Sequence, residues 1–165
     1  MAKESSFDVV STVDMQEVDN AYGQAKREIA QRYDLKGSGA EIALDKGARK
    51  LTVSAPAEFV AKQVIDVLGS KLIKRGIDLS AVKWGDPIPA AGQSVRQVAE
   101  IVEGIDKETA SKISKDIRGT KLKCKVTIEG DKLRVASASR DTLQDVIAFL
   151  KGQDYGQPLQ YVNYR

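Results

Sequence analysis

The chain of 165 residues contains no histidine, and this absence excludes several kinds of active site. Imidazole is the general base of Ser-His-Asp and Cys-His enzymes, a frequent zinc ligand and the side chain that titrates near neutral pH. We therefore expect neither a hydrolase of the triad type, nor a His-ligated zinc site, nor a histidine-based pH switch.

Cysteine and long apolar runs are also scarce. Cys124 is the single cysteine, so the chain cannot form an internal disulfide or a cysteine-rich metal site. The opening residues MAKESSFD contain no apolar signal core, and no stretch approaches the roughly 18 apolar residues of a membrane span. With 42% apolar and 30% charged residues, the composition is that of a globular protein. We expect it in the cytoplasm, away from membranes and without a metal or cofactor.

What the sequence does contain is a repeated order of elements. In the first half, Asp14 and Glu17 are spaced as a capping box, Pro56 fits the first turn of a second helix, and Gly76 fits the end of that helix. The hydrophobic pattern predicts a strand at 7–13, a helix ending near 31 or 33, strands at 41–44 and 50–54, a second helix, and a strand at 79–84. The predicted order is β-α-β-β-α-β.

The second half repeats this order after a proline-rich connection at 86–92. Asp106 and Ser139 are the expected N-caps of its two helices, and Gly119 and Gly152 their expected ends. The predicted strands are 95–103, 121–128, 132–137 and 159–164. The fold class is therefore α+β, with two ferredoxin-like domains, 1–91 and 92–165, each an antiparallel sheet with helices on one face.

Alternation along the second hairpin predicts a basic open face. Strand side chains alternate between faces, so Leu122, Cys124 and Val126 are expected to point inward. The outward residues are then Lys121, Lys123, Lys125, Lys132 and Arg134. Neighbouring like charges repel, so the cluster costs stability unless an anion is nearby. Two interpretations of this basic face stay open. It is either a binding site for the phosphate groups of a nucleotide or RNA, or a charged surface that keeps the sheet soluble.

The excess of basic residues also lies in the second half of the chain. Residues 1–91 hold 13 basic and 13 acidic side chains, whereas residues 92–165 hold 13 and 10, so the net charge of +3 lies in the second half.

Other functions of this fold lack the residues they need. RNA recognition modules carry aromatic residues on their central strands, and neither KLTVS nor KLRVAS has one. Stacking would depend on Phe7, Tyr161 or Tyr164, for which core packing is the alternative. A metal carrier needs a cysteine pair after its first strand, and an acylphosphatase-like enzyme needs an arginine there, but this chain has acidic residues. Ser139-Arg140-Asp141 could hold a phosphate at a helix start, or Ser139 could be a plain cap.

Five separated segments are distinctive: SFDVVS at 6–11, RYDLKG at 32–37, KLIKRGI at 71–77, SRD at 139–141 and GQPLQYVNYR at 156–165. Together they resemble the YajQ family of bacterial proteins over essentially the whole chain. The resemblance implies two ferredoxin-like domains that exchange their first strands, so that 7–13 joins the second sheet and 95–103 the first. It also implies nucleotide binding, with transfer-RNA binding suggested and, in some members, cyclic di-GMP binding. Leu35 stands where the family commonly has Phe, so the sequence does not support a stacking role there.

We therefore expect a non-enzymatic nucleotide- or RNA-binding protein whose hairpin cations contact phosphates. Arg32 and Lys36 are expected to form a second, weaker group, the alternative being an ordinary charged helix end. The competing function is a regulatory adaptor that senses cyclic di-GMP and acts through a protein partner or transcription factor. A hydrolase is the least favoured, because no acid, base and nucleophile converge in the sequence.

Overall fold

The computed structural model describes residues 4–165; residues 1–3, which fall in the first predicted domain, lie outside it. The chain folds into two compact units. We call residues 13–102 the continuous unit, and residues 4–12 together with 103–165 the split unit. No helix among the described residues is long and apolar enough to cross a bilayer.

The continuous unit packs two helices against a sheet. Its elements are α1 (Met15–Gln31), β2 (Glu41–Asp45), β3 (Lys50–Ala55), α2 (Glu58–Lys74), β4 (Val82–Trp84), β5 (Ile88–Pro89) and β6 (Val95–Ile101). The strand order is β2-β3-β6-β4, with β5 also paired to β6. The helical spacing of Val18, Ala21, Ala25 and Ile29 places all four side chains in a core shared with both helices and the sheet.

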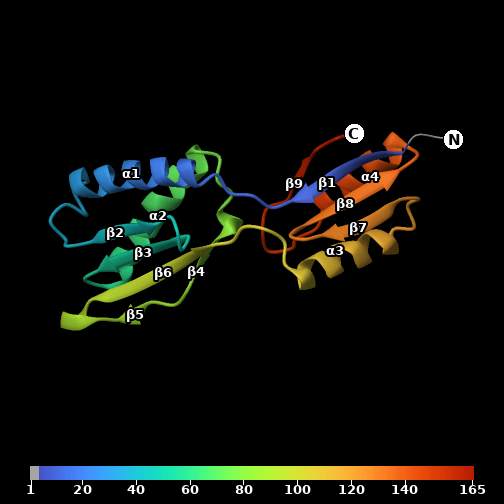
Figure 1. The fold of residues 1–165 in the computed structure, drawn as a ribbon. Coiled ribbons are helices and arrows are strands. Elements are labelled where there is room, and N and C mark those ends of the chain that lie inside the picture. Colours follow the sequence, from blue (N-terminus) through green and yellow to red (C-terminus); the bar gives the residue numbers. More distant parts are fainter. Residues whose placement is uncertain (1–3) are drawn as a thin grey trace. The chain divides into compact units, whose positions relative to one another are not determined.

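The split unit has the same construction. Its elements are β1 (Ser5–Val10), α3 (Lys107–Gly119), β7 (Lys125–Glu129), β8 (Lys132–Ser137), α4 (Arg140–Lys151) and β9 (Gln160–Val162). The strand order is β7-β8-β1-β9, and Figure 1 shows the blue β1 lying between β8 and β9. Phe7 is paired with Val135 on β8, Val9 is paired with Tyr161 on β9, and both β1 residues are fully buried in the core.

The two sheets have the same strand order. In the split unit, β1 lies between β8 and β9, and in the continuous unit β6 lies in the same position between β3 and β4. Each central strand is paired with the inner strand of a hairpin, β7-β8 or β2-β3, on one side and with a short strand, β9 or β4, on the other. All pairings are antiparallel. The arrangement confirms the predicted fold class of two α+β ferredoxin-like domains.

Several local expectations differ from the structure. Pro56 precedes α2, whose N-cap is Ala57, rather than lying in its first turn. Residues 79–81 form a short 3₁₀ helix, so only 82–84 of the predicted strand are extended. The expected Asp14 cap is confirmed by bonds from the backbone N–H groups of Gln16 and Glu17. The Glu17 carboxylate accepts a bond from Asn20 at 2.8 Å instead of completing the capping box.

Candidate functional site

The predicted basic hairpin lies in the split unit, and its strands are shorter than expected. Lys125 begins β7, whereas Lys121 and Lys123 precede the strand. Lys121 has a φ of 61°, a left-handed conformation that a strand does not accommodate, and its N–H bonds to the Arg118 carbonyl in a turn. The prediction of a strand from residue 121 is therefore wrong for its first four residues.

The alternation in exposure nevertheless persists through the irregular segment. Leu122, Cys124 and Val126 are partly buried against the core of the split unit. Lys121, Lys123 and Lys125 are exposed, and none of the three forms an ion pair with a described residue. These three lysines form an exposed, uncompensated row.

Lys132 and Arg134 lie on β8 and, unlike the three lysines, both contact a buried acidic side chain. Asp8 of β1 pairs in register with Arg134 and is fully buried. Its carboxylate oxygens lie 3.4 Å from Lys132 Nζ and 3.3 Å from Arg134 Nε. The sequence left open whether an anion lies near these cations, and β1 places the Asp8 carboxylate between Lys132 and Arg134.

Two further residues complete the surroundings of Asp8. Asn163 Nδ2 donates a hydrogen bond to Asp8 Oδ2 at 2.8 Å, and Arg165 Nη1 lies 3.6 Å from Oδ1. Arg134 also faces Glu129 at 3.6 Å. We call Asp8, Lys132, Arg134, Asn163 and Arg165 the Asp8 cluster. Three cations around one buried carboxylate leave this cluster with an excess of positive charge.

The pKa of Asp8 reflects a competition between burial and these partners. Burial alone would raise the pKa, because the charged carboxylate loses its hydration. The hydrogen bonds from Asn163 and Arg134 and the charge of Lys132 lower it further than burial raises it. The net shift is downward, so Asp8 is ionised at neutral pH and anchors the guanidinium and ammonium groups around it.

Arg32 and Lys36 lie in the continuous unit, at the end of α1. Arg32 Nε is 2.7 Å from Asp34 Oδ1, and Nη1 is 4.0 Å from Glu28 Oε2. Lys36 is exposed in the following turn, and Leu35 between them is buried in the core. The acidic neighbours of Arg32 compensate its charge, and Leu35 is not available for stacking.

The other sequence candidates are resolved by their surroundings. Phe7 is fully buried and Tyr161 is partly buried against the same core, with their rings 6.0 Å apart. Tyr164 is the exposed member of the three, at 61%. Ser139 Oγ accepts a bond from the Thr142 N–H at 3.2 Å, which is the N-cap arrangement.

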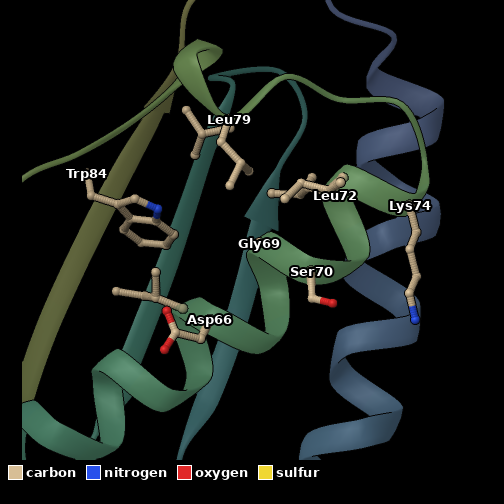
Figure 2. Close-up of a pocket in the computed structure, with 10 residues that line it drawn as sticks. Asp66, Gly69, Ser70, Leu72, Lys74, Leu79 and Trp84 are labelled. Carbon is tan, nitrogen blue, oxygen red and sulfur yellow. The ribbon is translucent and has the colours of Figure 1, made fainter.

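An apolar pocket of about 520 Å³ lies in the continuous unit beside α2 (Figure 2). Trp84 of β4 and Leu79 project toward the helix, and Gly69 of α2 lies beside Leu79, where a Cβ would make an ordinary van der Waals contact at 3.6 Å. Lys74 and Asp66 are its charged residues and are of opposite sign. This pocket offers apolar contact but no concentration of positive charge.

These features define a class of protein with two ferredoxin-like domains, one of which carries a row of exposed lysines beside an anchored cationic cluster. The family model described as "Nucleotide-binding protein YajQ-like" matches residues 5–165, and the chain belongs to the YajQ family.

Curated relatives extend over the full length of the chain. A protein of Chloroherpeton thalassium is 45% identical over 165 residues, covering 100% of both chains. A protein of Geotalea daltonii is 50% identical over 160 residues, 97% of this chain and 98% of the relative. One of Heliobacterium modesticaldum is 47% identical over 165 residues, 100% of this chain and 99% of the relative. Each of the three is named "Nucleotide-binding protein".

Sequence reasoning missed Asp8, Asn163 and Arg165. Asp8 carried a signal, because it is an acid between two apolar residues of a strand, and an acid there requires cations or donors nearby. Asn163 and Arg165 carried none, since their approach to Asp8 depends on the pairing of β1 with β9 across about 150 positions.

Proposed function

We propose that this protein is a non-enzymatic, cytoplasmic protein that binds nucleotides or RNA through their phosphate groups. The proposed contacts are Lys121, Lys123, Lys125, Lys132 and Arg134 of the split unit, with Arg32 and Lys36 of the continuous unit as a weaker second group. Transfer RNA is the structured RNA to test first.

The observation that carries this proposal is the row of Lys121, Lys123 and Lys125. All three are exposed without an ion pair to a described residue, while the side chains between them pack inward. Exposed and uncompensated lysines are what phosphate neutralisation and counterion release require. The names of the relatives add support for a nucleotide ligand.

The Asp8 cluster supports the proposal in a second way. Asp8 orients Lys132 and Arg134 before a ligand arrives, so less side-chain entropy is lost when they meet a phosphate. Beyond the Nε that faces Asp8 and the Nη2 that faces Glu129, Arg134 retains the donors of Nη1. An anchored guanidinium with open donors is suited to a phosphate oxygen.

The absence of catalysis is proposed from the side chains present. The chain has no histidine, and burial raises the pKa of the half-buried Cys124 thiol, which disfavours its nucleophilic form. Among residues 4–165, His, Cys, Asp and Glu side chains form no cluster of three that could hold a metal ion.

The test is RNA binding as a function of salt for the Lys123→Gln/Arg134→Gln variant. A matched control, Arg118→Gln/Lys151→Gln, removes the same charge from exposed positions at the ends of α3 and α4. We expect weaker binding and a flatter dependence of log K on log salt in the first variant. The slope should change by about 0.7 for the lost Lys123 contact to single-stranded RNA, and by less than that for Arg134, whose charge is partly compensated by Asp8 and Glu129. The control should change little.

Equal behaviour of the two variants would overturn the hairpin site. If removal of Arg134 unfolds the split unit, Lys123→Gln/Lys125→Gln repeats the test with exposed residues alone. A thermal-shift screen with cyclic di-GMP examines the adaptor alternative in parallel. Stabilisation by that dinucleotide at micromolar concentration, with weak RNA binding, would favour a sensor over the proposed function.

A further inference from the structure

A smaller pocket in the split unit combines arginine, aromatic and hydroxyl groups. Its volume is about 290 Å³, and it lies among the start of β1, the first turns of α4 and residues 164–165. Its polar and aromatic lining consists of Ser5, Ser6, Arg140, Gln144, Tyr164 and Arg165. None of these residues belongs to the hairpin contacts proposed above.

Arg140 brings an uncompensated charge to this pocket. It forms no ion pair with a described residue, and its Nε donates to Ser5 Oγ at 3.4 Å. This contact leaves the terminal guanidinium nitrogens, which carry four further N–H donors in the residue's standard inventory. Arg140 is also the first residue of the 12-residue α4, where the helix dipole adds positive potential.

Arg165 is the second cation and is fixed in place from two sides. Its backbone N–H donates to the Ser6 carbonyl at 2.9 Å, and its carbonyl accepts from the Ser6 N–H at 3.3 Å. Its Nη1 lies 3.6 Å from the buried Asp8 carboxylate. Asp8 therefore holds the guanidinium of Arg165 as well as the cations of β8, and Arg165 is also one of the residues that line the pocket.

Tyr164 supplies an aromatic surface beside these arginines. Its ring centroid is 6.1 Å from that of the fully buried Phe7, with an interplanar angle of 34°. Contact with the core supports the ring on one side, while 61% of the residue remains exposed. A supported, exposed aromatic ring is a platform on which a nucleobase stacks.

We propose that this pocket binds a single nucleotide that carries a phosphomonoester group. Arg140 holds the phosphate through its terminal guanidinium nitrogens, Tyr164 stacks against the base, and Arg165 lines the same pocket. The volume is near the lower limit of small-molecule pockets and suits one nucleotide rather than two. The proposal rests on the proposed function only in taking a nucleotide as the ligand. A free nucleoside monophosphate and the phosphorylated end of an RNA strand present the same chemistry.

The experiment compares two pairs of probes by calorimetry or fluorescence anisotropy. The first pair is adenosine 5′-monophosphate and adenosine, and the second is one short RNA with a 5′-phosphate or a 5′-hydroxyl. The test variants of the full chain are Arg140→Gln and Tyr164→Leu, and Arg118→Gln is the control with the same charge change. Arg140 and Tyr164 are both exposed, so the variants are expected to fold.

We expect the monophosphate to bind more tightly than adenosine and Arg140→Gln to weaken it by about tenfold or more, as for a lost charged hydrogen bond. Tyr164→Leu should weaken both the monophosphate and adenosine, and Arg118→Gln should change neither. An advantage of the phosphorylated RNA that disappears in Arg140→Gln identifies an RNA end as the ligand, whereas a response to the monophosphate alone identifies a free nucleotide. Equal affinity for phosphorylated and unphosphorylated probes, or equal effects of Arg140→Gln and Arg118→Gln, would overturn the proposal.

Failure of the proposed pocket can be distinguished from failure of the proposed hairpin site. If 5′-hydroxyl RNA binds and responds to Lys123→Gln/Arg134→Gln while no probe responds to Arg140→Gln, the pocket fails and the proposed function stands. If the monophosphate requires Arg140 while RNA ignores the hairpin variant, the hairpin fails and the pocket stands.

Discussion

At the scale of single residues, Asp8 is a fully buried carboxylate held by four partners in the split unit. Burying a carboxylate is costly unless cations and donors compensate for its lost hydration. Asp8 has one amide donor and three cations within 3.6 Å, drawn from β8 and from residues 163 and 165. One side chain thus joins β1, β8 and the segment after β9 while holding the basic groups of the sheet face.

Asp8 predicts a specific dependence of stability on acid. Its pKa in the folded protein lies below the ordinary value of 3.8, so the unfolded chain binds the proton more readily. The stabilisation is therefore present above the unfolded pKa and is lost as pH falls through the folded pKa. We expect the free energy of unfolding of the split unit to decrease below about pH 4. Urea unfolding followed by NMR signals of β8 at a series of pH values measures it.

Asp8→Asn is the control for this prediction, because it keeps the shape of the side chain and removes the titration. Asp106, whose pKa is lowered chiefly by hydrogen bonds from Thr109, contributes in the same direction in both proteins. The difference between wild type and variant therefore isolates Asp8. Identical acid dependence in the two proteins would contradict the assignment.

At the scale of elements, the two units depend on strands that are distant in sequence. Phe7 of β1 and Val18 of α1 are separated by 11 positions, yet Phe7 is fully buried in the split unit and Val18 in the continuous unit. Core substitutions at these two nearby sequence positions should therefore destabilise different units.

Hydrogen exchange of two variants, each with one core side chain replaced by alanine, tests this dependence. Phe7→Ala removes a central core ring, at a cost of about 3–5 kcal/mol, and should lower the protection of β7, β8 and α4. Val18→Ala should lower the protection of α1, α2 and β3 and leave β8 protected. Loss of protection in α1 and α2 by Phe7→Ala, with β8 unaffected, would contradict the pairing of β1.

The sequence predicted elements better than their partners, because hydrophobic periodicity is local and strand pairing is not. The spacing of Val18, Ala21, Ala25 and Ile29 was sufficient for α1. Alternation from residue 121 to 128 correctly separated exposed from packed side chains but overestimated the strand, since an irregular segment can alternate too. The surroundings of Asp8 require knowing that β1 lies between β8 and β9, and no local pattern contains that information.

At the scale of the whole molecule, the grouping of charge changes when the chain is divided into its two folded units. Residues 1–12 and 103–165 hold 13 basic and 11 acidic side chains, and residues 13–102 hold 13 and 12. The net charge of +3 is thus shared between the units rather than confined to one. Net charge therefore does not distinguish the units. Individual cations differ, since Lys121 and Lys123 have no acidic partner among the described residues, whereas Arg32 and Arg134 each have two.

This difference predicts unequal responses of two variants with the same change in charge. Lys121 and Lys123 have no ion pair with a described residue, whereas Arg32 is paired with Asp34 at 2.7 Å. If the proposed RNA binding holds, Lys121→Gln/Lys123→Gln should flatten the plot of log K against log salt by about 1.4 for single-stranded RNA. Arg32→Gln/Lys36→Gln should flatten it by about half of that or less, since a compensated arginine releases fewer counterions.

Fluorescence anisotropy with a labelled single-stranded RNA over a range of potassium chloride concentrations measures both slopes. The same titration with wild-type protein sets the reference, and thermal unfolding confirms that each variant remains folded at the temperature used. Equal slopes for the two variants would mean that RNA responds to the total charge alone. A larger effect of Arg32→Gln/Lys36→Gln would place the principal contact surface at the end of α1 instead. There Leu35 is buried between the two cations, and Tyr33 is the only exposed aromatic residue among the described residues 32–37.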